Sequence, residues 1–255
     1  MKVQFEIEAL EGTPAMLMSR RRPRIDDLPW GSLAERSASW SPVDVESQCA
    51  VWTEGAFSEY ASAAAFSALA GALLEARAPI QLTGLAADFV VDEMFHVELN
   101  ARVAMELGGA APFFVDFEKI APTTAAGLSP LQRACELALR ISCIGEALSV
   151  PVLVQNCRHS SDTLTRQVLS RIVRDEAPHA KLGAWVLDWA APRLDATERM
   201  RLSDIGRTML AAYAFLWEDP AQGSVQQLRV MRRHVRQRVI KPLAGRGIDL
   251  RHAQR

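Results

Sequence analysis

Two copies of one short pattern constrain the fold of this 255-residue chain more than any other feature of its sequence. The sequences Asp-Glu-Met-Phe-His (residues 92–96) and Asp-Glu-Ala-Pro-His (residues 175–179) each place a glutamate three residues before a histidine. On an α-helix, side chains three residues apart lie on the same face, so each pair can bind one metal ion. The two motifs therefore predict a helical protein with a metal site.

Alanine and leucine at helical spacing dominate the chain from about residue 45 onward, and runs of alternating β-branched residues are missing. Both features are typical of an all-α protein. Proline or paired glycines mark several helix ends, as at Pro79 and at Gly108-Gly109. We expect four long helices followed by two additional C-terminal helices, at about residues 44–77, 80–107, 129–157, 162–191, 196–217 and 225–239.

The lengths of the connections predict how the four long helices are arranged. Tight turns join the first helix to the second and the third to the fourth, so each pair is expected to be antiparallel. About twenty residues (110–128) join the second helix to the third, and at about 3.3 Å per residue they can cross some 60 Å. A helix of about 28 residues is only about 42 Å long. This connection predicts a four-helix bundle with one long crossover.

Residues 1–43 are predicted to form an N-terminal arm and loop. Residues 3–8 alternate apolar and polar side chains, as in a short edge strand or an extended arm. A basic run at residues 20–24, interpreted as solvated, and a loop with Trp30 follow. The remaining residues are expected to form one helical domain over 44–255, with the metal-binding bundle at about 44–191 and the extra helices at about 196–240.

Each motif needs further carboxylates from the helix packed beside it. Two facing residues of a helical hairpin lie at about equal distances from its turn, so the midpoint of their numbers should fall in that turn. Glu59 with Glu93 gives a midpoint at 76, next to the turn between the first two helices. Glu146 with Glu176 gives 161, inside the turn between the third and fourth helices. Glu54 with Glu93 gives 73.5, inside the first predicted helix, and Glu59 is therefore preferred. The predicted metal ligands are Glu59, Glu93, His96, Glu146, Glu176 and His179.

The surroundings of these acids favour a metal over an ion-pair network. Glu146 is the one charged residue between positions 141 and 156, and a buried carboxylate is costly unless a proton or a cation neutralises it. A buried salt-bridge network is the alternative, but four acids against two histidines would leave excess negative charge. Zinc usually closes its sites at four ligands, often with thiolate. A carboxylate-rich pair of sites suits iron or manganese better.

Four further residues are candidates for a pocket beside the metals. Phe89 and Asn100 share the inward face of the second predicted helix with its motif, and Ile172 shares that of the fourth. Cys143 lies one turn before Glu146 on the same face. It can touch the metal or a substrate, or it can be a small core residue.

Over residues 44–191, the two motifs and their two partner glutamates resemble the ligand set of ferritin-like dinuclear-iron carboxylate proteins. The chain length and the paired D-E-x-x-H motifs are most similar to diiron oxygenases of the p-aminobenzoate N-oxygenase type. That type has a histidine where this chain has Ile172, and Asn100 stands where ribonucleotide reductase small subunits carry their radical tyrosine. The resemblance implies that each motif binds one iron ion, with Glu59 and Glu146 as terminal or bridging ligands.

The resemblance also implies positioning residues and a function. Asp92 and Asp175 would accept the second N–H of the imidazoles and hold the rings, the alternative being helix-surface charges. The expected activity is that of a non-haem diiron oxygenase, which activates dioxygen to N-oxygenate or hydroxylate a small organic substrate. An external donor would supply electrons, because the sequence has no glycine-rich dinucleotide fingerprint. The alternatives are a ferroxidase, iron-storage or peroxide-scavenging ferritin-like protein, and a tRNA-modifying diiron hydroxylase.

Charge and composition narrow the class of protein further. The chain has 29 basic and 30 acidic residues, a balance that argues against a protein whose main task is to coat nucleic acid. Its four cysteines form no C-x-x-C pair, as expected in a reducing compartment. Glu6 and Glu8 stand where a secretory signal needs an apolar run, and the uncharged apolar segment 61–74 is too short to span a bilayer. We expect a cytoplasmic protein without a membrane partner, as a monomer or homodimer.

Six basic residues lie between positions 229 and 241, beside an apolar stripe in the last predicted helix. We interpret this segment as an amphipathic helix with a solvated basic face. The alternative is a docking surface for tRNA or for an acidic electron-donor protein.

Overall fold

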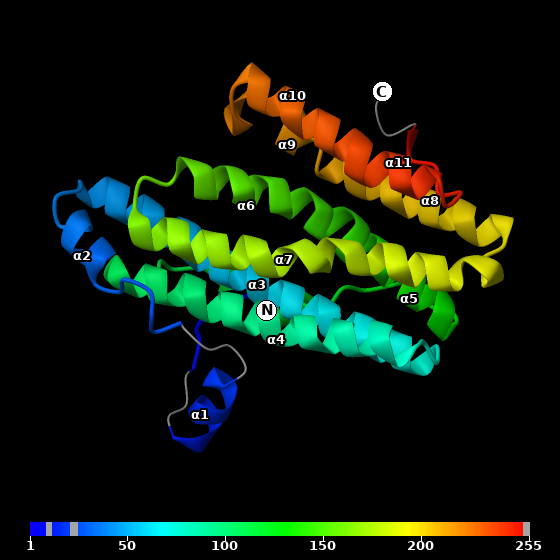
Figure 1. Cartoon of the computed structure of the whole chain (residues 1–255), viewed down its shortest axis with the longest axis horizontal. Helices are drawn as coiled ribbons and strands as arrows, with labels where there is room; N and C mark the ends of the chain where they lie inside the picture. Colours follow the sequence, from blue (N-terminus) through cyan, green and yellow to red (C-terminus); the bar gives the residue numbers. More distant parts are fainter. Residues whose placement is uncertain (9–11, 21–24, 252–255) are drawn as a thin grey trace. The chain divides into compact units, whose positions relative to one another are not determined.

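The computed structural model describes residues 1–8, 12–20 and 25–251 of the chain. Helices account for 75% of the residues and strands for 2%, which confirms the predicted all-α class. Figure 1 shows the order of the elements along the chain.

Three of the four long helices lie close to the predicted bounds. They are α3 (Pro42–Glu75), α4 (Ile80–Glu106) and α7 (Thr163–Ala190). As expected from the paired glycines, α4 is followed by Gly108 and Gly109 with φ values of 102° and 129°. Glycine adopts these left-handed conformations without a Cβ penalty, which is why the helix ends at this point.

The third long helix is interrupted in a way that the sequence did not predict. It consists of α5 (Pro130–Ala138), the π-helical stretch η2 (Leu139–Glu146) and α6 (Ala147–His159). Its start is as predicted, because Ser129 and Gln132 form a capping box and proline takes the first helical position. Short π-helical stretches are frequent at functional sites, and this one ends at the predicted ligand Glu146.

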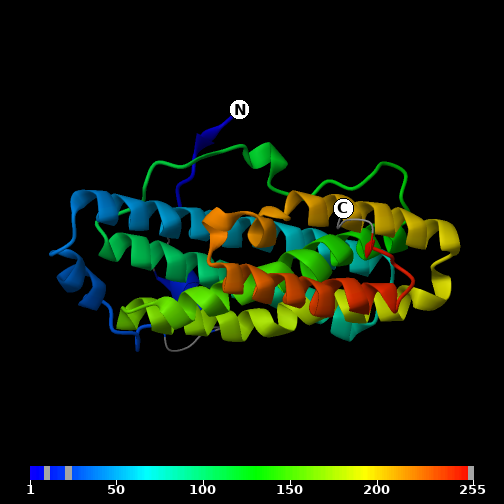
Figure 2. The ribbon, with the colours of Figure 1, turned by 90° about the horizontal axis from the view of Figure 1, so that it is seen from above.

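The C-terminal part is more broken than expected. The predicted helix at 196–217 is two helices with a turn between them, and the one predicted at 225–239 continues to residue 244. Figure 2 shows these elements in yellow to red. They are η3 (Ala191–Arg193), α8 (Ala196–Ala212), α9 (Phe215–Glu218), η4 (Pro220–Gln222), α10 (Val225–His234), the π-helical η5 (Val235–Ile240) and α11 (Lys241–Ala244).

The N-terminal arm is partly as predicted. Its strand β1 (Val3–Gln4) pairs antiparallel with β2 (Phe114–Val115), in the connection between α4 and α5, which also holds the 3₁₀ turn η1 (Phe117–Lys119). Two short helices, α1 (Thr13–Ser19) and α2 (Ser32–Ser37), replace the rest of the predicted loop. Both are shorter than the window over which helical periodicity can be recognised. Of the basic run, residues 21–24 lie outside the described residues.

The chain divides into two compact units, each assembled from segments that are distant in sequence. Unit 1 comprises Met1–Ser67, Ala87–Thr123 and Val154–Arg174, and unit 2 comprises Ala68–Ala86, Thr124–Leu153 and Asp175–Arg255. In unit 1, α3 packs on α4 through Phe66 and Phe89, whose ring centroids are 5.5 Å apart. In unit 2, one large apolar core joins residues of α5, η2, α6 and the end of α7 to those of α8–α11.

Two helical segments, Pro42–Glu75 and Pro130–His159, are long and apolar enough to cross a membrane by length and composition. Core helices of soluble proteins meet the same criterion, so this finding carries little weight. The predicted absence of a membrane partner stays a prediction.

Candidate metal centre

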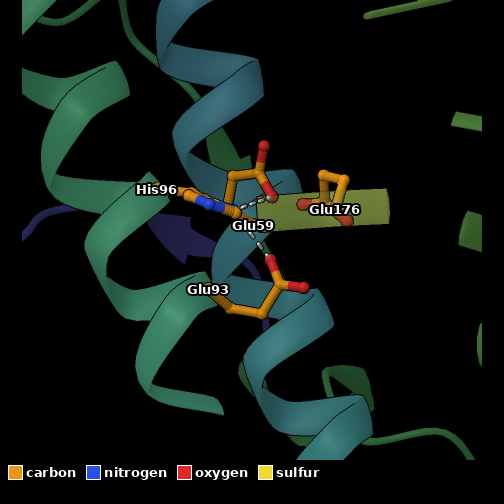
Figure 3. Close-up of side chains that lie close together, drawn as sticks. All are labelled: Glu59, Glu93, His96 and Glu176. Carbon is orange, nitrogen blue, oxygen red and sulfur yellow. Dashed lines mark ion pairs between the residues drawn. The ribbon is translucent and has the colours of Figure 1, made fainter. Parts of the chain in front are cut away.

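The helix α4 places Glu93 and His96 one turn apart, and both side chains are fully buried. On α3, Glu59 is partly buried and faces them. The Nδ1 atom of His96 lies 3.6 Å from Oε2 of Glu93 and 3.7 Å from Oε2 of Glu59. Figure 3 shows the three side chains pointing toward one another. The acid on α3 that joins the cluster is the one that the midpoint rule preferred, whereas Glu54 is exposed.

A fourth ligand group comes from α7. Glu176 is 1% exposed, and its carboxylate joins Glu59, Glu93 and His96 in a cluster whose ligand atoms all lie within 4.8 Å of one another (Figure 3). The predicted concentration of glutamate and histidine is thus confirmed as a buried cluster that could hold a metal ion. Residues separated by more than 110 positions supply it.

The donor set of this cluster fits a cation. Two negative charges 4.8 Å apart, the upper limit of the ligand-atom distances in this cluster, repel each other by roughly 3–4 kcal/mol at an effective dielectric constant of about 20. Three carboxylates share this space with one imidazole. Even a protonated His96 would leave two negative charges, and a divalent cation would balance them. Oxygen ligands with imidazole are a donor set that iron and manganese accept.

The other two predicted ligands are buried but stand outside this four-residue cluster. His179 is fully buried, and its Nδ1 lies 3.0 Å from Oε2 of Glu176. Glu146, the last residue of η2, is 6% exposed, and its Oε2 accepts a hydrogen bond of 3.1 Å from the hydroxyl of Ser149. Their role as ligands of a second metal ion stays a prediction.

A buried hydroxyl connects η2 to α7 at His179. The side chain of Ser142 donates a hydrogen bond to the backbone carbonyl of His179 and accepts one of 2.7 Å from the backbone N–H of Gly183. In a regular α-helix, a carbonyl and an N–H four residues apart, as in His179 and Gly183, form a hydrogen bond with each other. The hydroxyl of Ser142 therefore contacts both backbone groups of the helical turn that follows His179.

Gly183 makes this close approach feasible. A Cβ at this position would lie 2.5 Å from the carbonyl oxygen of Ala138 and 2.6 Å from Sγ of Cys143, which leaves no space for a larger residue. No pattern in the sequence indicated the hydroxyl contact. Ser142 could have been noticed only as one of the few polar residues in a mainly apolar segment.

The predicted pocket residues are all buried. Phe89 packs edge-to-face on Phe66, and Ile172 is 1% exposed. Asn100 donates a hydrogen bond of 2.8 Å from Nδ2 to the carbonyl of His96, and Gly55 leaves space for its side-chain oxygen. Burial raises the pKa of the Cys143 thiol to about 12, so it is protonated at neutral pH and behaves as a small core residue. Whether a substrate reaches these side chains stays a prediction.

Asp92 and Asp175, the predicted partners of the imidazoles, are both partly buried. Neither side chain is therefore a fully exposed charge on the helix surface. Their orienting role stays a prediction.

Comparison of the chain with protein-family models, with characterised proteins and with solved structures found no match. The case for a metal site therefore depends on the residues and their geometry.

Proposed function

We propose that the protein is a ferritin-like four-helix bundle that holds two iron ions and oxidises a small organic substrate with dioxygen. The observation that carries this proposal is the buried cluster of three carboxylates and an imidazole. Its residues come from α3, α4 and α7, and the same helix α7 adds His179 beside Glu176.

The six predicted ligands divide between two metal positions. Glu93 with His96 would hold one iron ion and Glu176 with His179 the other, while Glu59 and Glu146 complete or bridge the two. When bound, a reduced iron pair supplies two electrons for the activation of dioxygen. The chain's own task is to position these ligands, to neutralise the charge of the cations and to keep water out.

Buried apolar side chains on the three helices that carry the cluster support the last of these tasks. Phe66, Phe89 and Ile172 are each at most 2% exposed. A dry surrounding strengthens the electrostatic interactions of the carboxylates with a cation and limits side reactions with water.

Iron binding tests the site. After removal of metals, the chain is titrated anaerobically with ferrous ion, and the bound iron per chain is measured. We expect about two ions per chain in the wild type and fewer in Glu59→Ala. The matched control is Glu54→Ala, which removes an exposed acid from the same helix and should leave binding unchanged. Equal binding in the two variants would contradict the site.

Oxygen chemistry tests the reaction. Iron-loaded wild type and Glu59→Ala are exposed to oxygen with a donor of electrons and a mixture of small metabolites, and new oxygenated products are sought by mass spectrometry. We expect oxygen uptake and product formation in the wild type alone. An assembled shell that accumulates iron far beyond two ions per chain would instead establish iron storage and overturn the oxygenase.

A further inference from the structure

A cavity of about 550 Å³ opens at the C-terminal helices, within unit 2. Cavities of about 300–1,000 Å³ are of the size that holds small-molecule ligands. The cavity is formed by α9, α10 and η5, and the side chains that line it are Trp217, Glu218, Arg232, Arg233, Arg236 and Gln237.

The cavity is strongly basic in a chain of formal net charge −1. Residues 220–248 contain seven basic residues and no acidic one. Glu218 is the acid that lines the cavity, so three guanidinium groups face one carboxylate. The formal charges of these four side chains therefore add up to +2.

Several arginines elsewhere in unit 2 have acidic partners. Arg201 pairs with both Glu136 and Glu198, and Arg246 contacts Asp188 at 2.7 Å. By contrast, Arg233 and Arg236 form no ion pair with any residue that the structure describes, and both are exposed. Two unpaired guanidinium groups one helical turn apart are thus available to an anion.

Arg232 differs from these two because the protein holds it in place. Its Nε donates a hydrogen bond of 2.9 Å to the backbone carbonyl of Trp217. Trp217 itself is 5% exposed and belongs to the apolar core of the unit. One of the three guanidinium groups is therefore fixed on a rigid wall of the cavity, which reduces the entropy lost when a ligand binds.

We propose that this cavity binds a small phosphorylated molecule. The guanidinium group forms paired hydrogen bonds with phosphate oxygens, and a phosphate monoester carries about 1.5–2 negative charges, which matches the cavity. The three arginines lie within about 6 Å along the helix axis, a span that suits one compact anion better than an extended polymer. The proposal is independent of the metal centre.

Inorganic pyrophosphate is the probe. Its binding to the full chain is measured by equilibrium dialysis at low salt, in a buffer without phosphate. We expect one pyrophosphate per wild-type chain and at least about tenfold weaker binding in the double variant Arg233→Gln/Arg236→Gln, because two charge-assisted contacts are lost.

The matched control is Arg229→Gln/Arg238→Gln, which removes the same charge from exposed positions of α10 and η5 outside the cavity. We expect it to weaken pyrophosphate binding by less than about twofold at moderate salt. All three proteins keep the predicted metal ligands, so any pyrophosphate held by metal is common to them. Thermal melts monitored by circular dichroism confirm that the variants are folded.

Three results would overturn the proposal. Equal weakening in the two double variants would show a diffuse basic face, of the kind that attracts RNA or acidic proteins. Tighter binding of citrate than of pyrophosphate would indicate a carboxylate ligand. Failure of the wild type to bind pyrophosphate at millimolar concentration would remove the site altogether.

Discussion

At the scale of single residues, the C-terminal helices contain a histidine with unusual surroundings. His234 is partly buried, and its Nε2 lies 2.7 Å from the backbone carbonyl of Ala147. Burial lowers the pKa of His234 below its usual value of 6.5, with a smaller contribution from the charge of Arg238. The hydrogen bond to Ala147 opposes this shift, because the carbonyl can accept from the charged form as well.

This shift makes stability depend on pH. As the pH falls through 6.5, the unfolded chain binds a proton at His234 more readily than the folded protein does, so the free energy of unfolding decreases. We expect His234→Gln, which keeps a side-chain N–H donor, to lose less stability between pH 8 and pH 5.5 than the wild type. Urea unfolding at both pH values measures this.

The control for that experiment is His159→Gln, at an exposed histidine. It should show the same pH dependence as the wild type. An unchanged pH dependence in His234→Gln would show that His234 does not contribute.

At the scale of elements, the π-helical stretch η2 is the feature with the clearest link to the candidate site. It carries Glu146 at its last position and Ser142 at its centre, and Ser142 bridges two backbone groups of α7. A hydroxyl that inserts at a helix backbone changes the local path of that helix. We therefore expect the positions of Glu146 and His179 to be coupled through this contact.

Ser142→Ala tests this coupling. Loss of a buried hydroxyl that serves two backbone groups should lower the free energy of unfolding by about 1–3 kcal/mol. We also expect less iron per chain, because the backbone at His179 is no longer held. Chemical unfolding and anaerobic iron titration measure the two effects.

Ser203→Ala provides the comparison. Ser203 is also buried, and its hydroxyl likewise donates to a backbone carbonyl, that of Arg199, and accepts from a backbone N–H, that of Asp249. This variant should lose similar stability and keep full iron binding. If both variants bind iron as the wild type does, Ser142 has only a structural role.

At the scale of the whole molecule, the charge of the candidate metal centre affects folding. The unfolded chain keeps its glutamates apart and solvated, whereas the folded protein brings three of them within 4.8 Å with His96. A cation that binds only the folded state stabilises it by mass action.

Metal should therefore raise the unfolding temperature. At a free metal concentration of about 100 times Kd, the stabilisation is about 2.7 kcal/mol, or roughly 5–10 °C for a chain of this size. Scanning calorimetry with and without ferrous or manganous ion measures the shift. Glu93→Ala should show little or no shift, and a shift of equal size in that variant would place the metal elsewhere.

From the sequence alone we could predict the helical class, the bounds of α3, α4 and α7 within about two residues, and the residues of the cluster. Helical spacing, capping residues and paired glycines are local signals, and they act over a few positions. The choice of Glu59 over Glu54 needed only the geometry of a hairpin between two helices. These features follow from neighbours along the chain.

Four features became visible in the folded chain alone: the π-helical stretch, the contact of Ser142 with α7, the break between α8 and α9, and the basic cavity lined by Arg233 and Arg236. Each depends on which distant segments come into contact. A buried hydroxyl or a wider helical turn is stable only when packing elsewhere compensates for it, and no local pattern records that balance. The residues of the cluster and the three helices that carry them were therefore readable in the sequence, whereas the π-helical stretch and its contact with α7 were not.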